Sequence, residues 1–195
     1  PYVLKDVNVP IYSTRLTNAL IEHKLEEHDM LKKVKRKVVK YGQHINLGCF
    51  RVEFIRTNHS IQDAAALAIY SPAGIVLHTG DFKVDYTPVF GDAIDLQRFG
   101  EIGKKGVLAL LCDSTNAERP GFTDSEKSVG KTLDNIFSEH KNTRIIIATF
   151  ASNVDRVQQI INLQTSLAEK LRLRDEAWSI LYPSLRNLGY SFPAG

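Results

Sequence analysis

The chain has 195 residues, of which 43% are hydrophobic and 24% charged, and its formal net charge is +3. This composition is typical of a globular protein with a buried core, and the length fits one large domain or two small ones. Because no apolar run approaches the roughly 20 residues that span a membrane, we expect no membrane segment, and we expect no secretory leader either.

The first residue and the cysteines indicate the origin and the compartment of the protein. The chain begins at Pro1, in a stretch predicted to be helical, so we expect a fragment of a longer protein. Cys49 and Cys112 lie far apart in apolar strand patterns. This favours buried thiols in a reducing cytoplasm over a disulfide scaffold, and the spacing argues against a zinc site built on cysteine.

A basic run from Lys32 to Lys40 holds six positive charges in nine residues. A run of this kind is commonly a solvated strand or helix end. It would also suit a surface that follows the phosphates of a nucleic acid. The small net charge does not decide between these two interpretations.

Short strands dominate the first half of the predicted structure. A strand at residues 9–12 precedes a helix from about Thr14, and further strands are expected at residues 34–41, 45–47, 49–57, 65–70 and 74–79. Residues 50–56 alternate apolar and polar side chains, which predicts a strand with one solvated face. Residues 75–77 are continuously apolar, which predicts a central strand covered on both faces.

Helices alternate with strands in the second half. Helices are expected at residues 95–105, at residues 125–140 with Thr123 or Ser125 as the cap, and from about Asn153. Buried strands are expected at residues 107–111 and 144–149. The fold class is therefore α/β, with a β-rich layer carrying helices followed by a separate α/β unit, and the boundary is expected near residues 111–113.

Two polar clusters, at residues 56–60 and 78–83, follow predicted buried strands. Strand ends are where a rigid sheet presents reactive groups, and a His and an Asp presented in this way suit Zn²⁺ or Mn²⁺. His59 and Asp81 are therefore candidate metal ligands. A single His at a strand end is also commonly a hydrogen-bonded structural residue, and this alternative stays open.

An ordered series of motifs adds to these residues. It includes Thr57-Asn-His-Ser-Ile-Gln-Asp63 and His78-Thr-Gly-Asp-Phe-Lys83, together with residues 18–28, 101–107, 113–116 and 148–153. In this order the motifs resemble bacterial ribonuclease J, a nuclease with the metallo-β-lactamase fold and an inserted β-CASP domain. The resemblance implies a partial metallo-β-lactamase domain at residues 1–112 and the N-terminal part of a β-CASP domain at 113–195.

The resemblance also implies the metal site. His59 matches the third metal-ligand motif of the family, and Asp81 matches the fourth, whose carboxylate bridges two metal ions. Zn²⁺ is expected, two ions per site in the parent enzyme, with Mn²⁺ or Mg²⁺ as alternatives, and these ions activate water to hydrolyse a phosphodiester. The family's His-x-His-x-Asp-His cluster, which supplies most ligands, has no counterpart here, so the chain by itself is expected to be inactive.

Other site residues follow from the same resemblance. Asp113 matches an acidic residue that orients a catalytic His, although an Asx-turn with its neighbours would also explain it. Ser152 and Asn153 match a loop that contacts the nucleotide, with simple helix capping as the alternative. Supporting roles around the ligands are expected for Ser60, Asp63 and His78, and His78 is expected in the core or behind the ligands.

The implied function is an RNA-processing and RNA-degrading ribonuclease, cutting 5′-to-3′ from the end and also internally. The implied parent is a cytoplasmic enzyme that binds RNA and forms a homodimer or homotetramer. Two alternatives are kept: a non-catalytic RNA-binding module that uses the basic run, and another hydrolase on the metallo-β-lactamase fold. The Asp113 motif and residues 150–153 argue against a small-molecule hydrolase, since such enzymes lack the β-CASP insertion.

The resemblance is lost from Leu167 and resumes at Arg186-Asn-Leu-Gly-Tyr190. If the codons of residues 168–185 are read in a shifted frame, the genetic code allows the residue that the family carries at every position of this segment. We therefore predict that these residues are translated out of frame. The nucleotide sequence tests this, because an insertion and a deletion should bracket the segment.

Overall fold

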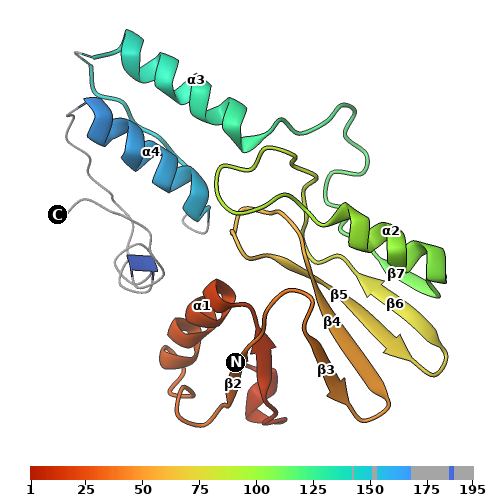
Figure 1. Ribbon diagram of the computed structural model, residues 1–195. Coiled ribbons are helices and arrows are strands. Elements are labelled where there is room, and N and C mark those ends of the chain that lie inside the picture. The colour runs from red at the N-terminus through yellow and green to blue at the C-terminus, as the bar shows by residue number, and fades with distance from the viewer. Residues whose placement is uncertain (142, 151–152, 168–184, 187–195) are drawn as a thin grey trace.

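The computed structural model describes residues 1–141, 143–150, 153–167 and 185–186, and it has a mixed α/β fold, as expected (Figure 1). The elements run in the order η1 (Val3–Lys5), β1 (Ile11–Ser13), α1 (Arg15–Glu26), β2 (Arg36–Val38), β3 (His44–Leu47), β4 (Phe50–Arg56), β5 (Ala65–Ser71), β6 (Gly74–His78), α2 (Leu96–Lys105), β7 (Ala109–Leu111), α3 (Glu126–Glu139) and α4 (Val154–Leu167). None of the described helices is long and apolar enough to cross a membrane.

The main sheet has five strands in the order β3-β4-β5-β6-β7. The first three pairings along this order are antiparallel, and β6 pairs with β7 in parallel. Strands β4, β6 and β7 therefore point in the same direction, and their carboxyl ends meet at one edge of the sheet. This direction decides where the polar clusters that follow these strands lie.

Helix α2 covers one face of this sheet. Ile55, Ala66, Leu77 and Ile102 form a buried cluster between the sheet and the helix. Glu53 lies on the same face and is only 3% exposed. The prediction that β4 has one solvated face is therefore wrong at Glu53, which α2 covers, while Arg51 stays exposed.

A pair of parallel strands, β1 and β2, lies at the other face, beside α1 (Figure 1). The buried side chains of Val39, Ile45 and Phe54 pack together there, with half-buried Tyr12 and Leu67 against them. The core thus has apolar clusters on both faces of the sheet. The predicted N-terminal strand and helix are confirmed, with the strand shifted by about two residues.

Helices α3 and α4 pack against each other. Gly130 of α3 allows a close approach, since a Cβ there would lie 2.5 Å from Oε1 of Gln159. Helix α4 also reaches the first half of the chain, where Val154 and Ile161 share a buried cluster with Leu16 of α1. The division into domains at residues 111–113 stays a prediction.

Several expectations about burial and strands are wrong. Residues 144–150 form no strand in the structure, although the apolar run at 145–147 predicted one. Strand β7 exists but lies at the edge of the sheet, where all of its residues are exposed. Strand β6 is interior to the sheet as expected, but only Leu77 is fully buried. Both Cys49 and Cys112 are free and exposed, not buried.

The segment predicted to be out of frame, residues 168–185, lies outside the described residues except for Leu185. That hypothesis stays a prediction.

Candidate functional site

Three of the predicted site residues lie at the carboxyl ends of the three strands that point the same way. His59 follows β4, Asp81 follows β6 and Asp113 follows β7. Because these strand ends share one sheet edge, side chains far apart in the sequence come together. The geometry of this edge is the candidate functional site.

His59 and Asp81 are close neighbours. Nε2 of His59 lies 3.8 Å from Oδ2 of Asp81, and their side chains are 38% and 78% exposed. Two ligands held about 2.0–2.1 Å from one tetrahedral zinc lie about 3.4 Å apart, so a small side-chain movement would let both bind one ion. Among the described residues, no group of three or more His, Cys, Asp or Glu side chains is arranged to hold a metal. The two donors fit part of a metal site.

Backbone contacts hold the two ligand loops against each other. Asn58 and Lys83 form an isolated antiparallel bridge, in which the Lys83 N–H donates to the Asn58 carbonyl at 2.7 Å. Gly80, directly before Asp81, has φ +61°, and a Cβ there would lie 3.2 Å from the carbonyl oxygen of Ala65. The loop that presents Asp81 therefore requires glycine at this position.

His78 lies beside the same turn. The structure places its side chain at the surface, which excludes the core alternative and leaves the expected position behind the ligands as a prediction. Its Nδ1 atom accepts a hydrogen bond from the N–H of Gly80 at 3.0 Å. This contact supports the turn before Asp81, which is compatible with a supporting role.

Asp113 connects the end of β7 to the Asp81 loop. Its carboxylate accepts hydrogen bonds from the N–H of Phe82 at 3.4 Å and from the N–H of Thr115 at 3.0 Å. The hydrogen bonds from Thr115 hold the pKa of Asp113 below its ordinary value, and the charge of His59 lowers it further. The Asx-turn, which was the alternative to a catalytic role for Asp113, is therefore present. The same carboxylate also lies next to the candidate metal ligands.

The remaining predicted residues lie in different places. Asp63 accepts hydrogen bonds from the Leu16 N–H at 2.6 Å and from the Thr17 hydroxyl, so it fixes the His59 loop to the start of α1. Ser60 is half-buried and makes no side-chain hydrogen bond in the described part of the chain. The side chain of Asn153 accepts from the Arg156 N–H at 3.2 Å, which is the helix cap kept as an alternative. Ser152 lies outside the described residues.

Asn58 is an organising residue that the sequence did not reveal. Its Oδ1 accepts from the N–H of Ile94 at 2.7 Å, and its Nδ2 donates to the carbonyl of Asp92 at 3.0 Å. Asn58 is 8% exposed, and it joins the His59 loop to the segment before α2. Its position directly before His59 was the only available signal.

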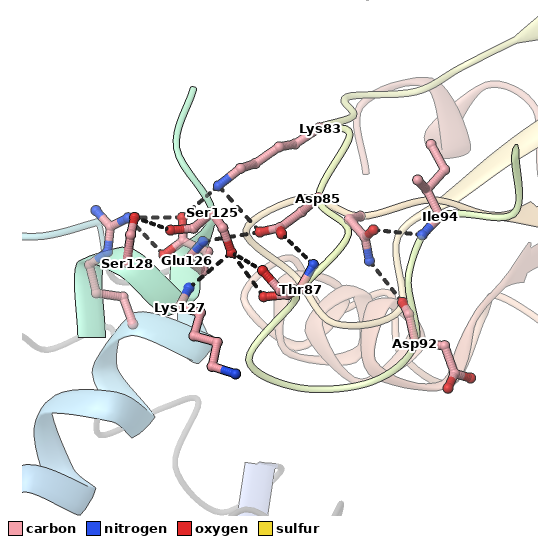
Figure 2. Close-up of polar contacts among 11 residues, drawn as sticks. Lys83, Asp85, Thr87, Asp92, Ile94, Ser125, Glu126, Lys127 and Ser128 are labelled. Carbon is pink, nitrogen blue, oxygen red and sulfur yellow. Dashed lines mark hydrogen bonds and ion pairs between the residues drawn. The ribbon is translucent and has the colours of Figure 1, made fainter. Parts of the chain in front are cut away.

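A second set of charged residues joins the Asp81 loop to α3 and α4, and we call Lys83, Asp85, Glu126 and Arg156 the junction network. Nζ of Lys83 lies 3.2 Å from Oε1 of Glu126 and 3.6 Å from Oδ2 of Asp85. Arg156 donates to both carboxylate oxygens of Glu126 at 3.0 and 2.8 Å. Figure 2 shows Lys83 and Asp85 reaching from their loop to the start of α3.

Asp85 also caps helix α3. Its carboxylate accepts from the N–H groups of Glu126 and Thr87 at 3.0 and 2.9 Å, while Ser125 caps the same helix as one of the two expected candidates (Figure 2). Burial would raise the pKa of Asp85, but these backbone hydrogen bonds, helped by Ser125 and Lys83, lower it overall. The carboxylate is therefore held ionised, where it stabilises the N-terminus of α3.

Asp155 lies beside this network, and none of the ion pairs of the described residues includes it. It is 7% exposed, and its Oδ1 atom is buried without a hydrogen-bond partner among the described residues. Burial, with the nearby charge of Glu126, raises the pKa of Asp155 to about 7. A small pocket is lined by Asp155, Glu126, Lys83 and His59, so the network borders one of the two candidate metal ligands.

Comparisons with known proteins agree with the motifs. The chain is 46% identical over 191 residues to "Ribonuclease J" of Synechocystis sp., covering 97% of this chain and 30% of that protein. It is 43% identical over 171 residues to "Ribonuclease J 1" of Streptococcus pyogenes, covering 88% and 30%. It is 37% identical over 189 residues to "Ribonuclease J2" of Bacillus subtilis, covering 97% and 34%. The chain thus spans about a third of the length of these relatives.

No protein-family model matches the chain. A crystal structure of a protein of unknown function from Enterococcus faecalis V583 is similar in fold, with a TM-score of 0.58 at 20% identity over 79% of this chain and 39% of that chain. With 37–46% identity to these three relatives along most of its length, the chain belongs to the ribonuclease J family and corresponds to part of those proteins.

Proposed function

We propose that the chain is part of a metal-dependent ribonuclease that hydrolyses RNA phosphodiester bonds, both 5′-to-3′ from the end and internally. The observation that carries this proposal is the meeting of His59 and Asp81 at one sheet edge, 3.8 Å apart, in a chain of the ribonuclease J family. The activity would belong to the whole protein, because this chain spans only about a third of the length of its relatives.

His59 and Asp81 would hold divalent metal, which we propose to be zinc, with two ions per site and Mn²⁺ or Mg²⁺ as alternatives. A nitrogen and a carboxylate oxygen are donors that zinc accepts, and a carboxylate can serve two ions. When bound, the ions would polarise the phosphodiester and activate water. Two donors do not complete such a site, so the 195-residue chain alone is predicted to leave RNA intact.

The chain's own residues would orient the site. Asp63 and Asn58 fix the His59 loop from two sides, and Gly80 with His78 shapes the turn before Asp81. Asp113 would orient a proton-transferring side chain from another part of the protein, since its carboxylate stays ionised beside the ligands. Asn153, together with Ser152, would contact the nucleotide from the start of α4.

The finer properties of the parent protein are also proposals. RNA would be its substrate, and a homodimer or homotetramer would be its assembly. We propose a cytoplasmic location, where a reducing environment would keep the exposed thiols of Cys49 and Cys112 free.

A chimera tests this function. The matching segment of the Synechocystis ribonuclease J is replaced by this chain, and cleavage of a 5′-monophosphorylated RNA is measured with Zn²⁺ or Mn²⁺. We expect cleavage that His59→Ala and Asp81→Asn abolish while RNA binding is retained. The matched control Asp134→Asn, an exposed carboxylate on α3, should cleave normally. Cleavage that survives Asp81→Asn would refute the proposal.

A further inference from the structure

The basic run of residues 32–40 is the feature that the metal site does not use. The structure places Lys32, Lys33, Lys35, Lys37 and Lys40 at the surface. Among the ion pairs of the described residues, none involves these five lysines. Arg36 is different, since its guanidinium lies 2.9 Å from the carboxylate of Glu22.

The acidic side chains of the neighbouring helix do not neutralise the lysines. Glu22 of α1 pairs with Arg36, and Glu27, at the end of the helix, pairs with Lys24 at 2.7 Å. Glu26 lies 3.5 Å from His23. The five lysines therefore have no ion-pair partner among the described residues, and we call them the lysine surface.

The backbone under the lysine surface is held firmly. Val34 and Val39, at either end, are 5% and 3% exposed and belong to two different buried clusters. Between them β2 pairs with β1, and the ladder extends through bonds from Ile11 N–H to the Lys35 carbonyl and from Val39 N–H to the Ser13 carbonyl. The lysines are thus presented by a fixed, extended segment.

The spacing along this segment suits a linear polyanion. Lys35 and Lys37 fall on one side of the strand, about 6.6 Å apart along it, because side chains alternate and each residue advances about 3.3 Å. This is comparable to the separation of neighbouring phosphates in an extended single strand. Lys37 is also held in place, with Nζ 3.1 Å from the Tyr12 hydroxyl and 5.0 Å from the centre of its ring.

We propose that the lysine surface is a contact site for the phosphate backbone of single-stranded RNA, separate from the metal site. The proposal extends the proposed function, from which it takes RNA as the ligand, but it needs neither His59 nor Asp81. Lysine contacts to phosphates position a nucleic acid without reading its sequence, and they make binding depend on salt. The surface would hold RNA while another part of the protein cuts it.

Fluorescence anisotropy with the 195-residue chain and a 5′-labelled single-stranded RNA of mixed sequence, in EDTA, tests this. The variant carries Lys33→Gln, Lys35→Gln, Lys37→Gln and Lys40→Gln, and the control makes the same change at four other exposed lysines, Lys104, Lys105, Lys131 and Lys141. We expect the variant to bind at least tenfold more weakly than the control at low salt. Its salt dependence, as log K against log salt, should flatten by about 0.7 for each lost phosphate contact.

A variant with Lys→Arg at the same four positions keeps the positive charges and should bind RNA like the unchanged chain. If it does, the weaker binding of the glutamine variant is due to lost charge and not to misfolding. Equal binding by the glutamine variant and its control would overturn the proposal. The proposal would also be overturned if the chain bound vesicles of phosphatidylcholine and phosphatidylserine through these lysines but did not bind RNA. Because EDTA is present, failure of the metal site leaves this result unaffected.

Discussion

Oδ2 of Asp81 lies 3.8 Å from Nε2 of His59, although the two residues follow different strands. They meet because β4 and β6 point in the same direction on either side of β5, so that their carboxyl ends share one edge of the sheet. The Asn58–Lys83 bridge then holds the two loops together. Strand direction and one backbone bridge are therefore sufficient to explain the pairing.

The turn before Asp81 should not tolerate a side chain. Gly80→Ala places a Cβ at φ +61°, 3.2 Å from the Ala65 carbonyl oxygen, and we expect it to lower the free energy of unfolding by about 1–2 kcal/mol. Gly100→Ala, in α2 with nothing within 4 Å of the new Cβ, is the matched control and should raise it by up to about 1 kcal/mol. Urea unfolding measures both, and equal stability of the two variants would contradict this account.

The pair Glu53–Arg98 should be essential to the layer between α2 and the sheet. Arg98 donates to both carboxylate oxygens of Glu53 at 2.7 and 2.9 Å, and the Tyr70 hydroxyl donates at 2.8 Å. Burial would raise the pKa of Glu53, but these hydrogen bonds outweigh it and lower the pKa. Arg98→Met leaves this buried carboxylate without its cation, and urea unfolding should show a loss of about 3 kcal/mol.

Two further variants test the same pair. Glu101→Gln removes the exposed partner of Arg98 and should cost less than about 1 kcal/mol. The double variant Glu53→Gln with Arg98→Met should recover most of the lost stability, because no charge is left buried. A loss in Arg98→Met no larger than that in Glu101→Gln would show that the pair is unimportant.

Asp155 should make stability fall as pH rises. Its pKa in the folded chain is about 7 against an ordinary 3.8, so between these values only the unfolded chain is ionised and unfolding becomes easier with increasing pH. Asp155→Asn imitates the neutral form and should be more stable than the unchanged chain at pH 8, by up to about 4 kcal/mol, with the difference vanishing near pH 4. Urea unfolding across this range measures it, with Asp134→Asn as the exposed control. A constant difference across the range would be incompatible with the assignment.

Glu126 should set the pH at which Asp155 ionises. Its charge helps raise the pKa of Asp155, so Glu126→Gln is expected to move the pH-dependent loss of stability to lower pH. The variant should also be less stable at neutral pH, because Lys83 and Arg156 lose their shared partner. Glu139→Gln, exposed on the same helix, should change neither property. An unchanged pH profile in Glu126→Gln would mean that the two carboxyl groups do not interact.

Local features of the fold could be predicted from the sequence. Ser125 caps α3, as one of the two expected candidates, because capping depends on residues close together in the chain. The solvated face predicted for β4 failed at Glu53, whose partner Arg98 lies in a later helix. The apolar run at 145–147 forms no strand in the described part of the chain, because apolar side chains alone do not decide whether a segment pairs with another.

The candidate site divides in the same way. Strand ends and motifs predicted His59 and Asp81 as site residues, and the motif resemblance alone added Asp113. The junction network could not be predicted, since it joins Lys83 to Glu126 and Arg156 across long stretches of sequence. The exposure of His78 could not be predicted either. It depends on which strands and helices cover the sheet, and the sequence pattern of β6 does not show this.

The most direct test of the central claim is the metal content of the Synechocystis chimera, measured by elemental analysis after dialysis against buffered zinc. We predict that His59→Ala and Asp81→Asn each lower the bound zinc per chain. Asp113→Asn, which changes a carboxylate beside the ligands, should retain the full content. Undiminished zinc in both His59→Ala and Asp81→Asn would contradict the assignment of these two residues as metal ligands.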